Sequence, residues 1–287
     1  MRRSNGFTLV ELLVVVGIIG MLASMLVPTI RVALAIAEAN VCLGQLKGVG
    51  TALQLYRQQN DQRWPWIANV RSDWSKVPTG ASRDQPLPQD NTDPGERSIT
   101  ALMFLLVREG QPAKLFVCPS DSDAVEDTQV RRDHDGDPET PMEYYGDFAG
   151  SRNVSYSYQA PVRRGDEGFV NGVADDDAAG VIVAEKTPAA GDPAWRPDAL
   201  AADTPIETVR ANLSPNHRGI GVINVLRVGL DVTQPRRPDV GTDLDNIYTA
   251  SGRRQTGARD GVSLSVLQHL SARDGFLIGP VADANQP

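Results

Sequence analysis

Residues 7–28 form an almost entirely apolar run that holds one charged side chain, Glu11. The run counts 22 residues, and a helix needs about 20 apolar residues to cross the hydrocarbon core of a bilayer. Arg2 and Arg3 precede the run, and basic flanking residues stay on the cytoplasmic side of a membrane. The run therefore predicts one membrane-spanning helix, with the rest of the chain on the other side of the membrane.

The helical pattern continues beyond the apolar run. Between residues 43 and 56, apolar residues and one glycine recur at steps of three and four, with polar residues mostly between them. They are Leu43, Leu46, Val49, Gly50, Leu53 and Tyr56. One helix over residues 7–58 would be about 75 Å long. Its first half suits lipid, and its amphipathic second half suits packing onto a globular head.

The residues around Glu11 carry a more specific signal. Residues 6–11 read Gly-Phe-Thr-Leu-Val-Glu, and this sequence before an apolar span resembles the processing site of type IV prepilins and type II secretion pseudopilins. The resemblance implies that prepilin peptidase cuts between Gly6 and Phe7 and methylates the new amine of Phe7. It also implies that Glu11 pairs with the Phe7 amine of a neighbouring subunit, which would neutralise both charges in apolar surroundings. Pro28 falls where these helices commonly carry a proline, and it would loosen the helix there.

Other interpretations of this segment stay open. Glu11 would need no partner if it lay shallow enough in the membrane to reach the lipid headgroups. A secretory signal peptide is the second alternative, because residues 33–35 offer a small-x-small cleavage site. The length of the apolar run, its internal charge and the continuing helical pattern argue against the signal peptide.

Small residues also share one face of the predicted helix. Gly17, Gly20 and Ser24 follow one another at steps of three and four, and small side chains let membrane helices approach closely. Glycine is also simply common in membrane helices, so both interpretations stay open.

The sequence after Asn60 predicts a mixed head domain. A stretch rich in Pro, Asp, Asn and Gly, to about Gly95, favours irregular loops, and residues 98–108 predict a short buried helix closed by Gly110. Strands are expected at residues 115–117, 154–159, 181–184, 221–227 and 276–278. The fold class is therefore α+β and pilin-like, with the long N-terminal helix packed on an antiparallel β-sheet head.

The expected organisation has three parts. They are a prepilin leader at residues 1–6, the transmembrane and amphipathic helix at residues 7–58, and an extracytoplasmic head at residues 59–287.

Several head segments resemble one large subgroup of pilin-like proteins, whose heads have no assigned activity and often carry an H-x9-DG signature. The similar segments are residues 42–47, 52–56, 116–121, 216–219 and 223–226. The signature itself is imperfect, because Arg227 and Val228 stand ten and eleven places after His217, where the subgroup has Asp-Gly. Allowing a two-residue insertion places Gly229 and Leu230 there. A role tied to that Asp-Gly is therefore not carried over to this chain.

The chain has two cysteines, Cys42 and Cys118, which form no CxxC pair and fit no zinc-binding spacing. Both are expected outside the membrane, where oxidation is possible. A disulfide would fasten the helix to the head and stabilise it by a few kcal/mol. Two buried, reduced cysteines are the alternative, and the sequence does not decide between them.

No enzyme, cofactor or metal centre is expected. The sequence lacks the Gly-x-Ser-x-Gly, His-Glu-x-x-His and P-loop patterns, and His217 near Ser214 is interpreted as a structural turn histidine. Asp133, Asp135 and Asp137 have the spacing with which calcium loops begin, but the sixth-place glycine and the distal glutamate are missing. This segment is interpreted as an acidic, solvated loop.

The chain is also not expected to bind nucleic acid. It has a net charge of −8 and no long Lys/Arg tract, so a polyanion would find little electrostatic attraction.

Together these features predict a structural subunit, a pilin or pseudopilin, of a type IV pilus-like or type II secretion filament. A minor subunit at the filament tip is one form of this prediction, because the tip tolerates a bulky head better than the shaft does. Its expected location is the bacterial inner membrane, with a single span and the head in the periplasm, and then the filament. The expected partners are prepilin peptidase, other pilin-like subunits, the inner membrane and the assembly machinery. A membrane-anchored or secreted ligand-binding module that does not polymerise remains the alternative, supported by the size of the head.

Overall fold

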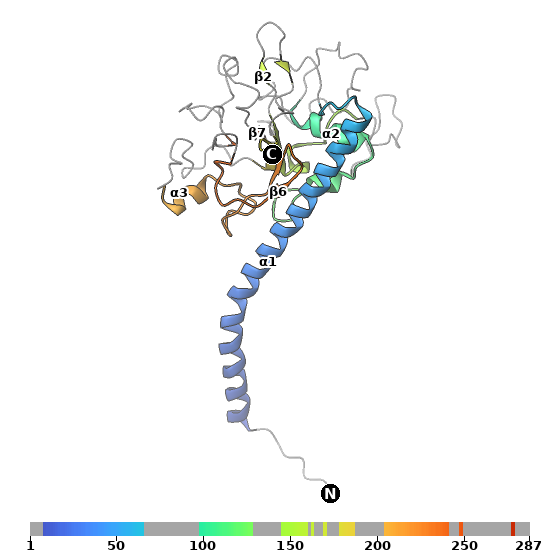
Figure 1. Ribbon diagram of the computed structural model, residues 1–287. Coiled ribbons are helices and arrows are strands. Elements are labelled where there is room, and N and C mark those ends of the chain that lie inside the picture. The colour runs from blue at the N-terminus through green and yellow to red at the C-terminus, as the bar shows by residue number, and fades with distance from the viewer. Residues whose placement is uncertain are drawn as a thin grey trace.

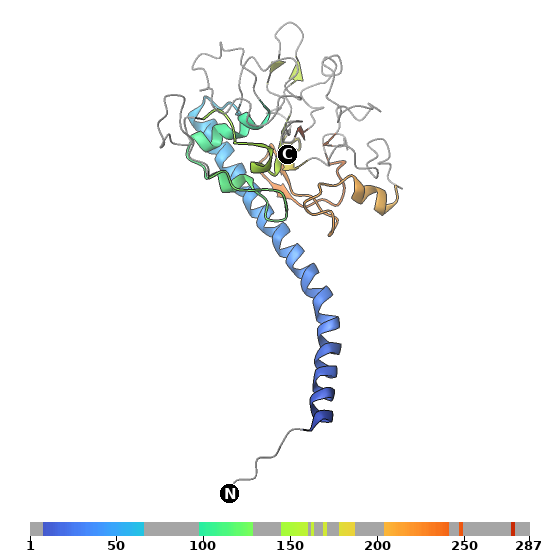
Figure 2. The same cartoon turned by 180° about the vertical axis from the view of Figure 1, so that it is seen from behind.

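The computed structural model describes residues 8–65, 98–128, 145–159, 178–186, 204–240 and 247–248, and the backbone of short strands at 162–163, 169–170 and 277–278. Figure 1 shows these residues as one long helix that projects from a globular head. The view from behind in Figure 2 shows that the C-terminal part of the same helix runs along one side of the head, while its N-terminal part projects away from the head. The predicted α+β, pilin-like fold is confirmed, whereas the division of the chain into leader, helix and head stays a prediction.

Helix α1 (Leu9–Gln59) is a single helix of 51 residues, close to the predicted range of 7–58. Thr8 caps its N-terminus, and it ends at Asn60, where the chain turns through two residues with positive φ, Asp61 and Gln62. Pro28 lies inside the helix without ending it. Helix α1 is visibly curved in Figure 1. A kink located at Pro28 stays a prediction.

The C-terminal half of α1 packs on the head through the apolar stripe that the sequence predicts. Its buried residues are Ala39, Cys42, Leu46, Val49, Gly50, Ala52 and Leu53. Gly50 allows the closest approach to the sheet, because a Cβ atom at this position would lie 3.1 Å from Leu226 Cδ1. The helix therefore rests directly on the central sheet and on the segment that precedes Cys118.

The main sheet has five strands in the order β6-β5-β4-β1-β7, and all its pairs are antiparallel. The strands are β1 (Tyr156–Gln159), β4 (Val181–Glu185), β5 (Val225–Arg227), β6 (Val232–Thr233) and β7 (Leu277–Ile278). A separate two-stranded sheet pairs β2 (Val162–Arg163) with β3 (Phe169–Val170). The predicted strands at 154–159, 181–184 and 276–278 are confirmed, with small differences in their bounds.

The predicted strand at residues 221–227 is too long. Gly221 lies in a turn with φ +70°, and its N–H donates to the carbonyl oxygen of His217. Only Val225–Arg227 pair with neighbouring strands. The turn precedes the strand because glycine adopts this left-handed conformation without a steric cost.

Four short helical elements complete the described part of the head. They are α2 (Thr100–Arg108), α3 (Ile206–Ala211) and the 3-10 helices η2 (Ala113–Phe116) and η4 (Ser151–Asn153). Helix α2 confirms the predicted buried helix at residues 98–108, since most of its side chains are inaccessible to solvent.

The predicted strand at residues 115–117 is wrong, because this segment forms η2 and the residue after it. The tight turn buries Ala113 and Phe116 together, which an alternating strand would not do. The side-chain amide of Gln45 on α1 donates to the carbonyl oxygens of Lys114 and Val117. These carbonyls therefore find their partner on the long helix, and not on a neighbouring strand.

The larger hydrophobic core lies between α1, α2 and the sheet. Phe148 stands at its centre, with its ring centroid 5.0 Å from that of Phe104 and 5.3 Å from that of Phe116, both in edge-on geometry. A second buried cluster consists of Val181, Ala184, Leu213, Ile223, Val225, Ile247 and Tyr248. Strands β4 and β5 contribute side chains to both clusters, so the sheet is buried between them.

Candidate functional site

The first turn of α1 is organised by Thr8 and Glu11. The backbone N–H of Thr8 donates to Glu11 Oε2 at 2.9 Å, and the Thr8 hydroxyl donates to the same oxygen at 2.7 Å. In return, the backbone N–H of Glu11 donates to Thr8 Oγ1 at 3.3 Å. This reciprocal capping box holds the carboxylate at the N-terminal end of the helix, where the helix dipole favours a negative charge.

The N-terminal half of α1 carries the largest exposed apolar surface of the described chain. Eighteen large apolar side chains between Leu9 and Ile36 are exposed, at 45–77% of their full area. They are Leu9, Val10, Leu12, Leu13, Val14, Val15, Val16, Ile18, Ile19, Met21, Leu22, Met25, Leu26, Val27, Ile30, Val32, Leu34 and Ile36. Among the described residues, α1 is the one helix long and apolar enough to cross a membrane, and its apolar window is not buried.

The small residues of this half leave its surface open. A Cβ atom added at Gly17 or Gly20 would meet nothing within 4 Å. The hydroxyl of Ser24 donates to the Met21 carbonyl oxygen of its own helix at 2.7 Å. Close helix packing at these positions therefore remains a hypothesis that needs a second chain.

Several residues singled out in the sequence lie outside the described parts of the structure. These are the cleavage residues Gly6 and Phe7 and the acidic segment at residues 133–137. Cleavage, methylation and the pairing of Glu11 with Phe7 therefore stay predictions.

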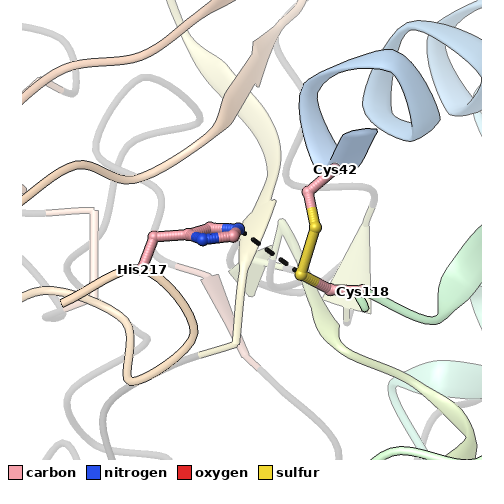
Figure 3. Close-up of side chains that lie close together, drawn as sticks. All are labelled: Cys42, Cys118 and His217. Atoms are coloured by element: carbon pink, nitrogen blue, oxygen red, sulfur yellow. Dashed lines mark hydrogen bonds between the residues drawn. A yellow bond between two sulfur atoms is a disulfide. The ribbon is translucent and has the colours of Figure 1, made fainter. Parts of the chain in front are cut away.

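The structure joins the two cysteines that the sequence left open. Cys42 on α1 and Cys118, two residues after η2, form a disulfide with their Cα atoms 5.4 Å apart (Figure 3). Both residues are fully buried. The bridge spans 76 residues of sequence and links the long helix covalently to the head.

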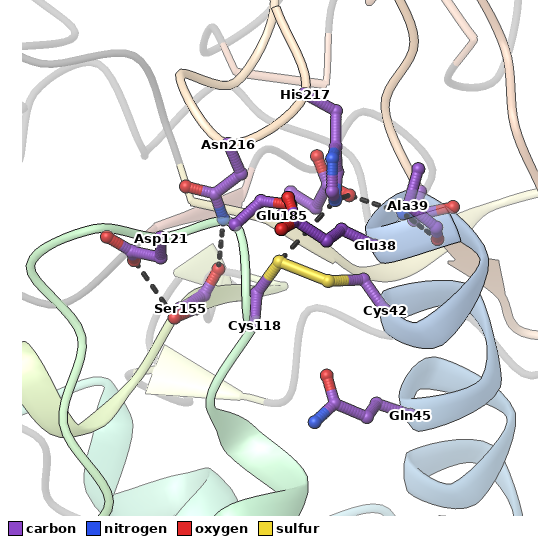
Figure 4. Close-up of a disulfide and its surroundings, with 12 residues drawn as sticks. Glu38, Ala39, Cys42, Gln45, Cys118, Asp121, Ser155, Glu185, Asn216 and His217 are labelled. Atoms are coloured by element: carbon purple, nitrogen blue, oxygen red, sulfur yellow. Dashed lines mark hydrogen bonds and ion pairs between the residues drawn. A yellow bond between two sulfur atoms is a disulfide. The ribbon is translucent and has the colours of Figure 1, made fainter. Parts of the chain in front are cut away.

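Polar contacts flank the disulfide on the same face of α1 (Figure 4). Two turns of the helix contribute Glu38, Ala39 and Gln45, which all bond to the head. Ser120 Oγ donates to Glu38 Oε2 at 2.9 Å, and Asn224 Nδ2 donates to the Ala39 carbonyl oxygen at 3.2 Å. Tyr156 Oη donates to Gln45 Oε1 at 2.9 Å. The disulfide and these hydrogen bonds together hold the head at a fixed position along the helix.

A buried histidine and glutamate lie against the disulfide. His217 Nε2 is 3.4 Å from Cys118 Sγ and 3.2 Å from Glu185 Oε1. Glu185, the last residue of β4, accepts a hydrogen bond from Asn224 Nδ2 at 2.5 Å on that same oxygen. Its second oxygen, Oε2, is buried and takes no hydrogen bond. This is the one group of buried ionisable side chains in the described head that adjoins the bridge.

Burial controls the protonation of this pair. Desolvation raises the pKa of Glu185 from an ordinary value of 4.5 to about 8, although hydrogen bonds from Asn224 act in the opposite direction. Desolvation also lowers the pKa of His217 from 6.5 to about 4, against the attraction of Glu38. The pair therefore holds one proton in total between about pH 4 and about pH 8.

The interpretation of His217 as a turn residue agrees with its backbone, whose carbonyl oxygen accepts from the N–H groups of Ile220 and Gly221. Ser214 Oγ accepts from the Asn216 N–H, while His217 Nε2 faces the disulfide and Glu185. Glu185 is not among the residues predicted from the sequence. Its signal is a charged residue directly after the apolar run Val181–Ala184, at the end of a strand with no exposed face.

Comparisons with known proteins agree with the N-terminal observations. Residues 1–27 match the family model described as the prokaryotic N-terminal methylation motif. The chain is also similar to "Type II secretion system core protein G" of Pseudomonas aeruginosa, with 39% identity over 59 residues. A protein with the same description from Dickeya chrysanthemi is 29% identical over 133 residues.

The extent of these similarities is limited. The Pseudomonas match covers 21% of this chain and 42% of that protein, so it spans less than half of the relative's length. The Dickeya match covers 44% of this chain and 83% of that protein. No solved structure matches the chain significantly. The resemblance to pilin-like proteins and pseudopilins, predicted from residues 6–28, is confirmed by the motif and by both relatives.

Proposed function

We propose that this chain is a pilin-like structural subunit that is processed by prepilin peptidase and built by α1 into a type IV pilus-like or type II secretion filament. The observation that carries the proposal is the division of α1 into two halves. The half from Leu9 to Ile36 exposes apolar side chains, while the half from Ala39 onward buries one face against the head and is linked to the head by a disulfide.

This division suits two successive environments. Before assembly, the exposed apolar half spans the inner membrane as a single helix, with the head in the periplasm. In the filament, the same half packs against the corresponding helices of neighbouring subunits, and the heads face outward. The assembly machinery extracts the subunit, and the disulfide keeps the head fixed to the helix during that transfer.

Glu11 sets the register between subunits in this proposal. Cleavage between Gly6 and Phe7 creates a cationic amine four residues before Glu11. The carboxylate of one subunit then pairs with the amine of another, which removes two isolated charges from apolar surroundings. The capping box with Thr8 supports this role, because it engages Oε2 and orients the carboxylate at the helix start.

The expected partners are prepilin peptidase, other pilin-like subunits and the secretion or pilus assembly machinery. The proposed role is mechanical and needs no catalytic residue, cofactor or nucleic acid. The similarity to "Type II secretion system core protein G" of two bacteria favours a pseudopilin.

Replacing Glu11 with alanine tests the assembly step in the native host. The variant is expected to accumulate in the inner membrane and to disappear from the sheared filament fraction. Glu126→Ala, which removes an exposed carboxylate from the head, is the matched control and should enter filaments normally. A Glu11→Ala protein that enters filaments as well as the wild type would contradict the proposal and favour a binding module that does not polymerise.

A further inference from the structure

Four potential metal ligands converge where α1 meets the head. Cys42 Sγ, Cys118 Sγ and a ring nitrogen of His217 lie within 4.8 Å of one another, and all three residues are buried. They come from α1, from the segment after η2 and from the turn before β5, so no local sequence spacing reveals them. Figure 3 shows the imidazole directed at the bridge from the opposite side.

Glu185 supplies the fourth group. Its Oε1 atom lies 3.2 Å from His217 Nε2, the same nitrogen that lies 3.4 Å from Cys118 Sγ. The side chain is completely buried, and Oε2 has no hydrogen-bond partner. A buried carboxylate oxygen without a donor is costly unless something else satisfies it.

The distances fit a single tetrahedral ion. Zinc binds nitrogen and oxygen at about 2.0–2.1 Å and thiolate sulfur at about 2.3 Å. At tetrahedral angles these bonds separate nitrogen from oxygen by about 3.3 Å and nitrogen from sulfur by about 3.5 Å. The observed separations around His217 Nε2 are 3.2 Å and 3.4 Å. Both separations from this nitrogen therefore match ligand spacing. Breaking the S–S bond would let the two sulfurs separate to the about 3.8 Å that two zinc–sulfur bonds at a tetrahedral angle require.

We propose that Cys42, Cys118, His217 and Glu185 form a zinc site when the two cysteines are in the dithiol state. Thiolate, imidazole and carboxylate groups all bind zinc, and four such protein ligands would close a tetrahedral site. Asn224 supports the site from outside, since its Nδ2 donates both to Glu185 Oε1 and to the Ala39 carbonyl oxygen. Such outer hydrogen bonds fix the orientation of a metal ligand.

The chemistry of the exchange balances with a dithiol as the reductant. The dithiol gives two electrons and two protons to the Cys42–Cys118 bridge and itself becomes a disulfide, leaving two thiols. Zinc then displaces both thiol protons and forms two zinc–sulfur bonds. Oxidation of the thiolates by a disulfide of a partner oxidant reverses the exchange and releases the ion. The metal and the bridge are thus alternative links between the same two segments.

This arrangement gives the chain a way to hold α1 to the head before oxidation is complete. The four ligands lie on four different segments, so one ion would join α1, the segment after η2, β4 and the turn before β5. The inference does not depend on whether the chain enters a filament.

Cobalt is a suitable probe, because tetrahedral cobalt with thiolate ligands gives intense visible bands and a near-ultraviolet charge-transfer band. The full chain in detergent is stripped of metal and titrated with Co²⁺ with and without a phosphine reductant, and Zn²⁺ is then added in competition. The reduced chain is expected to bind one equivalent with thiolate bands that Zn²⁺ abolishes, and the oxidised chain none. A reduced chain without these bands would overturn the proposal, as would equal binding by the oxidised chain.

Two variants that each replace a carboxylate by its amide test where the ion binds. Glu185→Gln should weaken cobalt binding by at least about tenfold, since even an outer-shell change costs about 10–100-fold. Asp121→Asn is the matched control, because Asp121 bonds Ser155 and Lys186 nearby but is not a proposed ligand. Unchanged binding by Glu185→Gln would remove it from the site.

Protection of the two cysteines from alkylation provides a second measurement of zinc binding. Zinc should slow the alkylation of Cys42 and Cys118 in the reduced wild type and in Asp121→Asn. No protection in the wild type would also contradict the proposal.

Discussion

Cys42 and Cys118 stand 76 positions apart in sequence, and their Cα atoms lie 5.4 Å apart across a disulfide. One residue belongs to α1 and the other to the head, so the bond crosses the junction on which the proposed transfer from membrane to filament depends. The neighbouring bonds of Glu38, Ala39 and Gln45 reinforce the same junction.

Removing the bridge should lower the stability of the head. For a loop of 76 residues, the chain-entropy model gives a loss of about 4.5 kcal/mol, equivalent to a Tm lower by about 10 °C. The Cys42→Ala/Cys118→Ala variant, melted in detergent without reductant and metal, should show this decrease. Wild-type protein melted with reductant and chelator is the matched control, and its Tm should approach that of the variant. Two free thiols in unreduced wild-type protein would contradict the assignment.

Gln45 should matter more than its exposure suggests. Its amide donates to the Val117 carbonyl oxygen at 2.8 Å, and its carbonyl accepts from Tyr156 Oη at 2.9 Å. Gln45→Ala leaves both partners without this bond and should cost about 1–3 kcal/mol in the free energy of unfolding. Gln54→Ala, at an exposed position of the same helix, should change it by less than about 0.5 kcal/mol. Equal effects in denaturant unfolding would show that Gln45 does not fasten the helix.

The two glycines Gly44 and Gly50 should respond differently to valine. A Cβ atom at Gly44 meets nothing within 4 Å, whereas one at Gly50 lies 3.1 Å from Leu226 Cδ1. Both substitutions change helix propensity equally, so the difference between them reports packing against β5. Gly50→Val should be about 1–3 kcal/mol less stable than Gly44→Val. Similar stabilities would mean that α1 lies farther from the sheet than the structure places it.

Stability should fall as pH rises from about 6.5 to about 8. In the unfolded chain, Glu185 and His217 have lost both protons above their ordinary pKa values of 4.5 and 6.5. The folded pair keeps one proton until the pKa of Glu185 at about 8. The folded state thus binds more protons in this window, and about 2 kcal/mol of stability is lost across it.

Between about pH 4.5 and 6.5 the folded and unfolded pair each hold one proton, so this pair contributes no slope there. Thermal melts of the oxidised chain in detergent should therefore show the fall only in the upper window. Glu185→Gln should remove it, and Asp121→Asn should keep it. A fall of the same size in Glu185→Gln would assign the pH dependence to other groups.

The long helix could be predicted because its signals are local. The apolar run and the stripe from Leu43 to Tyr56 follow helical spacing, and the structure keeps both within α1. The buried helix α2 and the strands β1 and β4 were predicted for the same reason, since each is a short apolar run between turn residues.

The remaining features depend on contacts between distant segments. Residues 115–117 have strand-like side chains, but Gln45 captures the carbonyl oxygens of Lys114 and Val117, and the segment turns into η2. Glu185 and His217 come from β4 and from the turn before β5, two segments that only the tertiary fold brings together. No spacing within the sequence encodes that meeting, which is why the buried group around the disulfide could not be predicted.

N-terminal mass spectrometry of the protein from native membranes tests the central claim most directly. Processing by prepilin peptidase predicts a mature chain that begins with N-methylated Phe7 and retains Thr8 and Glu11 at its start. A chain that begins near Ala37, after a signal-peptide cleavage, or one that still begins at Met1, would contradict the account of α1 as the assembly helix of a pilin-like subunit.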